Sequence, residues 1–419
     1  MHHLSPAHDT LAPVQFFQKN GYYAVGDKIF NHKIMAMQYS TSSRMPMTWN
    51  FNDEAYSQIN WRQRLGIDLR SLYRLRAQQL RDKYKYLILA WSGGGDSTQM
   101  LESFLKNNIK IDELVIIWPV STMQGKYRAS TDTSSNNMLS EWDFSIKPKL
   151  DKIRESHPDL RITIADVFSD MSSREDSDDT VLITEKHSFA SIQRFRALDS
   201  VIEKRVEQHL DVATVIGVGP TDVFLYDNWL AVQFVDQATN PGSKSDYTLK
   251  GWPRNIEFFY WTPDFPEIPR EQAHALSDYL KTNPNELKKI TRFVLNKNRV
   301  FEKVYSPDFE LYRRLYKSVI YPDYNPNTFQ VVKPDDTHMF HTNYEWFHQN
   351  PHSKEFTDPW ISTVKAHQSL IDPGFFDFYQ GRVVRYRTFY SKPYLVDRLP
   401  ATEEITNVLA SCQDPLILV

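Results

Sequence analysis

The chain has 419 residues, 41% of them hydrophobic and 24% charged, which is ordinary for a globular protein large enough for two or three domains with sizeable cores. The formal net charge of -3 provides no global attraction to nucleic acid. Cys412 is the only cysteine, so an intramolecular disulfide and any cysteine-rich zinc or iron–sulfur site are excluded.

Residues 1–83 are expected to form a cap segment. Within it, residues 21–30 predict a small hairpin that turns at Gly26-Asp27. Leucines near helical spacing then predict a helix over 68–84: Leu69, Leu72, Leu75 and Leu80.

Residues 84–283 alternate between apolar runs and helical patterns. The predicted strands cover 85–91, 112–120, 160–167, 212–219 and 256–261. The predicted helices cover 97–107, 135–156, 187–209 and 270–282. Such alternation predicts an α/β fold, a parallel five-stranded sheet covered by helices on both faces. The loops at 92–97, 119–134, 167–186 and 217–226 are then expected at one rim, where such sheets bind ligands.

Residues 284–419 lose this alternation and are rich in Pro, Tyr, Phe and His. They predict a mainly helical or irregular C-terminal domain or extension on the substrate side, with a helical pattern over 284–317. A polar, acidic loop at 169–179 is either an ordinary solvated loop or a lid.

The most informative segment is Ser92-Gly93-Gly94-Gly95-Asp96-Ser97, between an apolar strand and a helix. Strand, glycine-rich turn and helix is an arrangement that holds phosphate, because glycines allow close backbone approach and helix amides point at the anion. A tight turn without a ligand is the alternative. No lysine follows the glycines, so the segment is not the common ATPase loop.

The pattern Ser-Gly-Gly-x-Asp-Ser resembles the signature of the PP-loop ATP pyrophosphatases, the HUP-type family of asparagine synthetase, GMP synthetase, NAD synthetase and tRNA-lysidine synthetase. The matching residues are Ser92, Gly93, Gly94, Asp96 and Ser97. The layout as a whole is similar to that of PP-loop proteins encoded by large tailed bacteriophages. The resemblance implies binding of ATP and Mg²⁺ by residues 92–97, with Asp96 and Ser97 in catalysis.

A second glycine segment, Gly217-Val-Gly219-Pro220-Thr221-Asp222, ends the fourth predicted strand. It resembles the Gly-x-Gly-Ser-Asp element of the asparagine synthetase branch, with one extra residue and Pro220 as a departure. The resemblance implies that Gly217 and Gly219 face the nucleotide. Asp96 and Asp222 could together hold magnesium on the pyrophosphate. The alternative for Asp222 is a helix cap after a Gly-Pro turn.

The resemblance also implies that the adenine lies near the end of the second strand, at Ile117 and Trp118. Trp118 is expected either to stack on the base or to pack in the core. Cationic candidates for phosphate contacts are Lys126, Arg128, Arg194 and Arg196.

The C-terminal part holds two further patterns. The histidines His338, His341, His348 and His352 match no metal-site spacing and are interpreted as ordinary histidines. Basic residues interleaved with aromatic ones suit single-stranded nucleic acid or a strand with one wet face: Arg382, Arg385, Arg387 and Lys392.

The expected function is that of a ligase-type enzyme that splits ATP to AMP and pyrophosphate while adenylating a carboxylate or carbonyl oxygen, after which ammonia or an amine displaces AMP. Two alternatives stay open: an enzyme that modifies nucleic-acid bases, and a nucleotide-binding module without turnover. No apolar run approaches the ~20 residues of a membrane span and no signal peptide is evident. The expected location is the cytoplasm.

Overall fold

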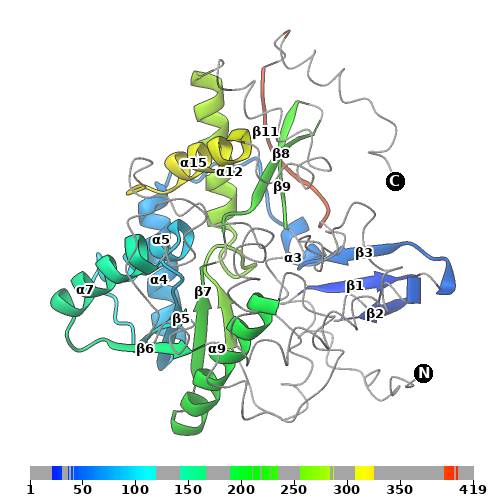
Figure 1. The fold of residues 1–419 in the computed structure, drawn as a ribbon. Coiled ribbons are helices and arrows are strands. Elements are labelled where there is room, and N and C mark those ends of the chain that lie inside the picture. The colour runs from blue at the N-terminus through cyan, green and yellow to red at the C-terminus, as the bar shows by residue number, and fades with distance from the viewer. Residues whose placement is uncertain are drawn as a thin grey trace.

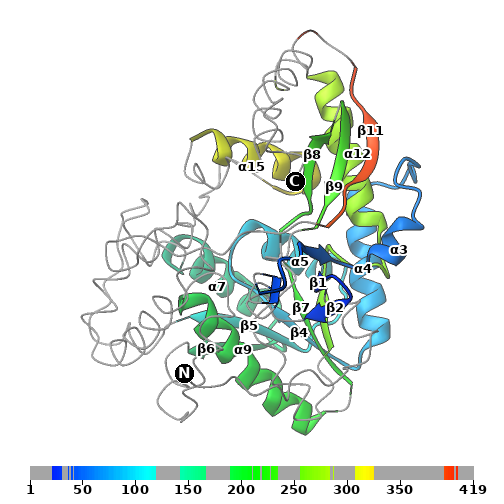
Figure 2. The ribbon, with the colours of Figure 1, turned by 90° about the vertical axis from the view of Figure 1, so that its right-hand side faces the viewer.

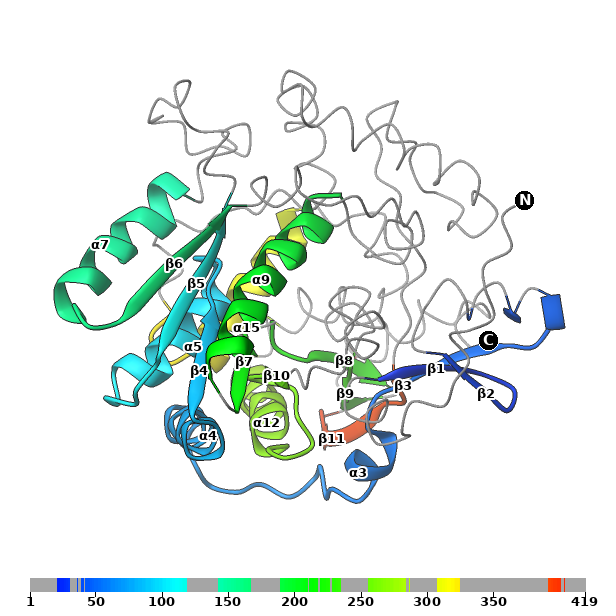
Figure 3. The ribbon, with the colours of Figure 1, turned by 90° about the horizontal axis from the view of Figure 1, so that it is seen from below.

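The computed structural model describes residues 21–30, 42–118, 142–166, 189–234 apart from three positions, 255–283, 307–324 and 391–400, with a few single positions besides. Its centre is a parallel sheet of β4 (Tyr86–Ala90), β5 (Glu113–Trp118), β6 (Arg161–Asp166), β7 (Val212–Ile216) and β10 (Asn255–Phe258). The five strands are ordered β10-β7-β4-β5-β6; Figure 1 shows β5, β6 and β7 within the whole fold, and Figure 3 shows all five strands side by side. This confirms the predicted five-stranded parallel sheet.

Helices cover both faces of this sheet. One face packs against α4 (Leu69–Lys83), α5 (Gly95–Leu105) and α7 (Lys147–Ser156), while α9 (Phe189–Gln208) covers the other, as Figure 3 shows. Side chains of β4 alternate between these two faces. Leu87 and Leu89 belong to the hydrophobic cluster on the α4, α5 and α7 side, and Ile88 belongs to the cluster on the α9 side. Both faces are therefore buried, as their continuous apolar runs predicted.

The α4 helix matches the helix predicted at 68–84. It begins at Leu69 because the carboxylate of Asp68 caps it by accepting a hydrogen bond from the Ser71 amide, 3.0 Å away. Leu72 and Leu80 are buried, but Leu75 is 42% exposed. Leu75 therefore lies off the buried face of α4, which holds Leu72, Tyr73, Arg76, Ala77 and Leu80, although its spacing helped to predict the helix.

Two antiparallel sheets flank the centre. The first joins β1 (Tyr22–Val25), β2 (Lys28–Phe30) and β3 (Met47–Asn50), and it confirms the hairpin predicted around Gly26. The second joins β8 (Asp222–Tyr226), β9 (Trp229–Gln233) and β11 (Tyr394–Arg398) (Figure 2). The expected rim loop at 217–226 is therefore wrong beyond Thr221, because 222–226 pairs as a strand.

An aromatic cluster ties together segments that are distant in the sequence. Phe234, which follows β9, stacks on Tyr56 of α3 (Asp53–Ser57) with ring centroids 4.4 Å apart. Trp61 stacks on Tyr394 of β11 at 5.0 Å, and Trp261 meets Phe234 edge-on at 5.6 Å. Such pairs add to the stability gained by burial, and they join residues 56 and 61 to β9 and β11.

The remaining described helices are α12 (Glu267–Thr282), α15 (Pro307–Ile320) and a short π-helical turn, η2 (Trp142–Ile146), before α7. Within the described ranges, no helix has the length and apolar character needed to cross a bilayer. The loops at 119–134 and 167–186 and the start of the helix predicted at 135–156 lie outside the described residues.

Candidate functional site

The strand order creates one distinctive place at the carboxyl edge of the sheet. β4 has β5 on one side and β7 on the other, and the chain reaches those two neighbours by crossovers in opposite directions. Parallel sheets bind ligands at such a switch point, because the loops leaving the two strands separate and leave a crevice. The segments that leave β4 and β7 here are 91–94 and 217–221.

The segment after β4 is a strained, tightly hydrogen-bonded turn. Gly93 has φ +79°, a left-handed conformation that favours glycine. Gly94 is the N-cap of α5 and no side chain caps this helix. The Ser97 hydroxyl, buried under the turn, accepts from the Ser92 amide at 3.2 Å and donates to the Gly94 carbonyl at 3.2 Å. Ser97 therefore holds the turn in shape.

The η2–α7 segment covers the outer side of this turn. A Cβ atom on Gly93 would lie 2.5 Å from Cγ1 of Ile146. The Ser145 hydroxyl donates to the Gly93 carbonyl at 2.7 Å. Lys149 Nζ lies 3.3 Å from the Thr98 hydroxyl, which brings a cation to the first turns of α5.

The two glycine segments meet, as the sequence predicted. A Cβ on Gly217 would lie 2.9 Å from the Ser97 Cα atom and 3.3 Å from the Asp96 carbonyl oxygen. A Cβ on Gly219 would lie 3.4 Å from Asp96 Oδ2. The end of β7 therefore packs directly on the first turn of α5, and a side chain at Gly217 would push the two backbones apart.

The Asp96 carboxylate is the charged centre of the site. Lys317 of α15 donates from Nζ to Asp96 Oδ2 at 3.0 Å, and the Tyr321 hydroxyl donates to Oδ1 at 2.8 Å. The Tyr260 hydroxyl donates to the Asp96 carbonyl oxygen at 2.8 Å. The Asp96 and Lys317 side chains are 18% and 13% exposed, so the pair is only partly withdrawn from water.

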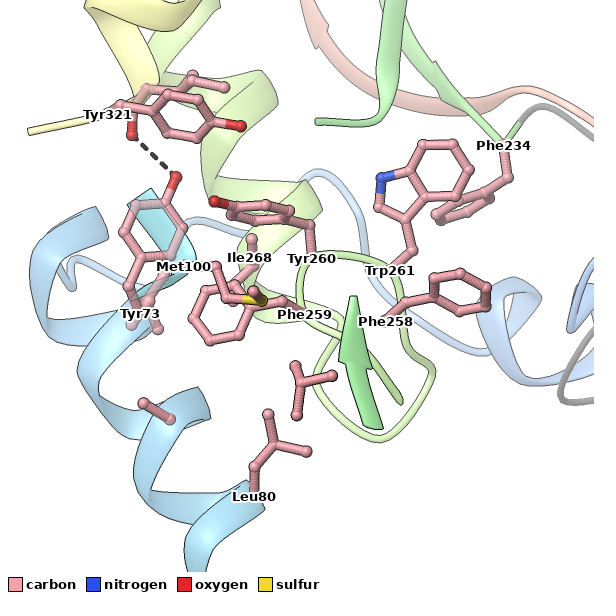
Figure 4. Close-up of a cluster of buried hydrophobic side chains, with 14 of the residues drawn as sticks. Tyr73, Leu80, Met100, Phe234, Phe258, Phe259, Tyr260, Trp261, Ile268 and Tyr321 are labelled. Carbon is pink, nitrogen blue, oxygen red and sulfur yellow. Dashed lines mark hydrogen bonds between the residues drawn. The ribbon is translucent and has the colours of Figure 1, made fainter. Parts of the chain in front are cut away.

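The tyrosines around Asp96 stay protonated donors. Figure 4 shows Tyr73, Tyr260 and Tyr321 grouped together, and the Tyr73 hydroxyl bonds to the Ile320 carbonyl at 2.8 Å. Burial raises the pKa of Tyr260 and Tyr321 well above the usual value, and the Asp96 charge raises it further. Their hydroxyl groups therefore donate to acceptors across the whole physiological pH range.

The predicted adenine residues lie at the end of β5. Trp118 is 5% exposed and stacks on Trp142 of η2 with ring centroids 5.6 Å apart. Ile117 packs with the cluster on the α9 face. Trp118 therefore has the core contact that the sequence offered as an alternative to stacking on a base.

Asp222 is exposed and begins β8, in register with Gln233 of β9. It belongs to the antiparallel sheet and not to a helix cap. Among the described residues, His, Cys, Asp and Glu side chains form no group of three or more that could hold a metal ion. Among the described side chains of the turn, the Asp96 carboxylate and the hydroxyls of Ser92 and Ser97 offer oxygen ligands for a metal ion.

The sequence does not single out the cations that reach the turn. Lys317 lies 221 positions after Asp96, in a segment interpreted only as a helix on the substrate side. Its spacing to Tyr321 puts both on one face of a helix, which is the only local signal. Lys149 falls inside the predicted helix 135–156 but belongs to no motif.

Several predicted residues lie outside the described residues. They are Lys126, Arg128, the four histidines from His338 to His352, Arg382, Arg385, Arg387 and Cys412. Arg194 and Arg196 are in α9, whose side chains at these positions are likewise outside the described part of the chain. Lys392 is exposed, with Nζ 5.7 Å from the Tyr394 ring centre.

No protein-family model matches this chain, and a search of curated proteins found no match either.

Proposed function

We propose that the chain is an ATP pyrophosphatase of the PP-loop type, with a HUP-type sheet, which adenylates a carboxylate or carbonyl oxygen and releases pyrophosphate. The observation that carries the proposal is the meeting of two glycine segments at the switch point. The Ser-Gly-Gly-Gly-Asp-Ser turn starts α5, and Gly217 touches the backbone of that turn. Each segment on its own has a sequence pattern that is typical of phosphate binding.

The backbone at 93–97 would hold the phosphate groups of ATP. The first amides of a helix have no partner within the helix and its dipole is positive at this end, so both favour an anion. A side chain on Gly93 or Gly217 would distort this turn, because at each position a Cβ would lie within 3 Å of a neighbouring protein atom. Ser97 would keep the turn in shape.

Asp96 would hold Mg²⁺, because its carboxylate is the anionic oxygen ligand nearest to the turn and hard oxygen ligands suit this ion. Bound there, Mg²⁺ would neutralise charge that develops on the departing pyrophosphate. The side chains present supply little covalent chemistry, which fits a reaction driven by positioning and charge stabilisation. A substrate oxygen would attack the α-phosphorus, and ammonia or an amine would then displace AMP.

The test is the product pattern from ATP labelled at the α-phosphate, incubated with Mg²⁺ and pools of carboxylic acids, amides, nucleosides and RNA. We expect AMP and pyrophosphate from the wild type with at least one pool, and none from Asp96→Asn. The control is Asp151→Asn, an exposed carboxylate on α7 that pairs only at long distance with Lys147 and Arg154. It should keep wild-type turnover.

Release of ADP and phosphate instead would contradict the proposal. If ATP raises the melting temperature but no pool yields pyrophosphate, the chain is a nucleotide-binding module without turnover. Turnover that appears only with the RNA pool would favour the base-modifying alternative.

A further inference from the structure

Lys317 occupies an unusual place for a cation. Its Nζ atom lies 3.7 Å from the position that a Cβ on Gly95 would take, directly beside the first residue of α5. The N-terminus of a helix carries partial positive charge, so a lysine ammonium there is disfavoured. Its ion pair with Asp96 offsets that cost in this structure. A binding site for a polyanion explains why the chain puts a cation at this end.

The packing of α15 holds Lys317 beside the first turn of α5, so it is not a freely mobile surface side chain. The Tyr316 hydroxyl donates to the Thr221 carbonyl at 3.3 Å, beside the second glycine segment. Beyond α15, Asp323 pairs with Lys106 at the other end of α5 at 2.9 Å. The Tyr316 bond and the Tyr321 bond to Asp96 hold Lys317 at the first turn of α5, whereas the Asp323–Lys106 pair lies at the far end of that helix.

A second observation on the same side concerns Thr221. Thr221 is fully buried, and its hydroxyl has no hydrogen-bond partner among the described residues. A buried hydroxyl without a partner is costly. Thr221 lies two positions after Gly219, where an added Cβ would lie 3.4 Å from Asp96 Oδ2. The segment that packs on the first turn of α5 thus contains unused hydrogen-bonding capacity.

We propose that Lys317 is a phosphate-binding residue and that its ion pair with Asp96 is the resting, anion-free arrangement of the site. An incoming polyphosphate takes the Lys317 ammonium, and the Asp96 carboxylate is thereby released to bind a divalent cation. Tyr321 is a positioning residue that keeps the carboxylate at the turn during the exchange. The inference rests on the proposed function only in taking the polyphosphate of a nucleotide as the natural anion.

The chemistry of the two side chains suits an exchange of partners. An ammonium has three donors on a flexible stem and can turn from a carboxylate to a phosphate, whereas a guanidinium is fixed in a planar fork. Partial exposure of both groups allows water to reach them during the exchange. The site therefore changes partners without leaving a fully buried charge unpaired.

The experiment measures binding of inorganic pyrophosphate in EDTA, and of ATP with Mg²⁺, by titration calorimetry on the full chain. We expect Lys317→Met to weaken pyrophosphate binding about tenfold or more, since a charge-assisted hydrogen bond is lost. Asp96→Asn should tighten binding without metal about threefold or more, because Lys317 no longer has a competing carboxylate. Asp96→Asn should also weaken ATP binding with Mg²⁺.

The matched control is Lys106→Met, which also removes a lysine that links α5 to the end of the α15 segment. It should bind pyrophosphate like the wild type. Lys317→Arg keeps the charge and should retain more affinity than Lys317→Met. A gain of affinity in Asp96→Asn cannot arise from misfolding, so it keeps the test valid if Lys317→Met unfolds.

The inference is overturned if Lys317→Met binds pyrophosphate as Lys106→Met does, or if Asp96→Asn fails to tighten binding. ATP binding that does not depend on Lys317 refutes this inference alone and is compatible with the proposed function. Lys317-dependent pyrophosphate binding without any ATP binding sinks the proposed function alone. If the wild type binds neither, both are rejected.

Discussion

Two carboxylates in this protein, Glu257 and Asp96, pair with cations that differ in burial and in chemical type. Glu257 of β10 is fully buried and faces Arg76 of α4, which is 1% exposed, with 3.1 Å between Oε2 and Nη2. Its other oxygen accepts from the Tyr84 hydroxyl and from Lys83 at 3.0 Å. Asp96, at the carboxyl edge of the same sheet, pairs with a lysine and remains 18% exposed.

The difference separates a structural pair from an exchangeable one. A guanidinium and a carboxylate buried together need every lone pair and proton satisfied, because neither can turn to water. Arg76 also donates to the Phe258 carbonyl at 3.0 Å and to Gln79 at 2.7 Å, so that among the described residues only its Nε atom has no partner. Glu113, which is fully buried, forms a similar pair with Arg205, whose side chain is 15% exposed. Asp96 has a partner that can rotate and a neighbouring helix terminus that attracts anions. The pairs within the sheet stabilise the fold, and the pair at its edge can serve binding.

The largest expected effect comes from Glu257→Gln. The substitution keeps the shape but leaves Arg76 as a buried, uncompensated charge, so we expect the free energy of unfolding to fall by about 3–5 kcal/mol. Urea unfolding followed by circular dichroism measures this. Glu102→Gln, which removes a half-exposed partner of Lys106, is the control and should change stability by less than about 1 kcal/mol. Equal effects of the two would refute the distinction.

The second-largest expected effect comes from Gly93→Ala, which tests whether the turn at the carboxyl edge of the sheet resists an added side chain. Gly93→Ala places a Cβ 2.5 Å from Ile146 Cγ1 in a left-handed conformation, so we expect a loss of about 3 kcal/mol. Gly66→Ala is the control, because Gly66 has φ +69° but nothing within 4 Å of the added atom. It should cost only about 1 kcal/mol. Chemical unfolding of both gives the difference, and equal losses would show that the turn yields to Ile146.

The sequence predicted what local patterns control. The strands of the central sheet, α4 and the turn at 92–97 follow from apolar runs, leucines near helical spacing and consecutive glycines. The contact between Gly217 and the turn followed from parallel strands, whose carboxyl ends share one edge. These features need only neighbours in the sequence or the direction of the strands.

The rest depends on partners distant in sequence. β11 pairs with β9 although Leu395 and Ala231 are far apart in the chain, and such pairing leaves no trace in either segment alone. Lys317 has no motif, and only the packing of α15 along α5 brings it to Asp96. The spacing of Leu75 predicts an inward position, but Arg76 takes the buried stripe through its pairing with Glu257.

A smaller effect concerns Asp397 of β11, a carboxylate of intermediate exposure. Burial alone would raise its pKa, but hydrogen bonds from Lys281, Ser277 and Arg64 outweigh this and hold the pKa at about 2. The unfolded value is about 3.9, so the stabilisation is complete above that pH and is lost as the pH falls toward 2. We expect this group to contribute about 2 kcal/mol.

The measurement is the free energy of unfolding of wild type and Asp397→Asn at about pH 6 and at about pH 3. The difference between the two proteins should be largest at the higher pH and shrink at the lower one. Lys281 and Arg64 tie α12 and the segment before α4 to β11 through this carboxylate. A difference that does not change with pH would show that Asp397 acts by packing and not by charge.

The smallest expected change in stability is that of Asp96→Asn, the same kind of substitution as Glu257→Gln. The amide oxygen can still accept from Tyr321, and the Lys317 side chain is 13% exposed and flexible enough to turn toward water, so the loss should be about 1 kcal/mol or less. Urea unfolding of the two variants under identical conditions compares them directly. A loss as large as that of Glu257→Gln would make Asp96 a structural carboxylate, whose release from Lys317 would cost too much for an anion to drive it. A small loss, combined with absent turnover, would instead mean that the charged pair at the edge of the sheet serves binding and not folding.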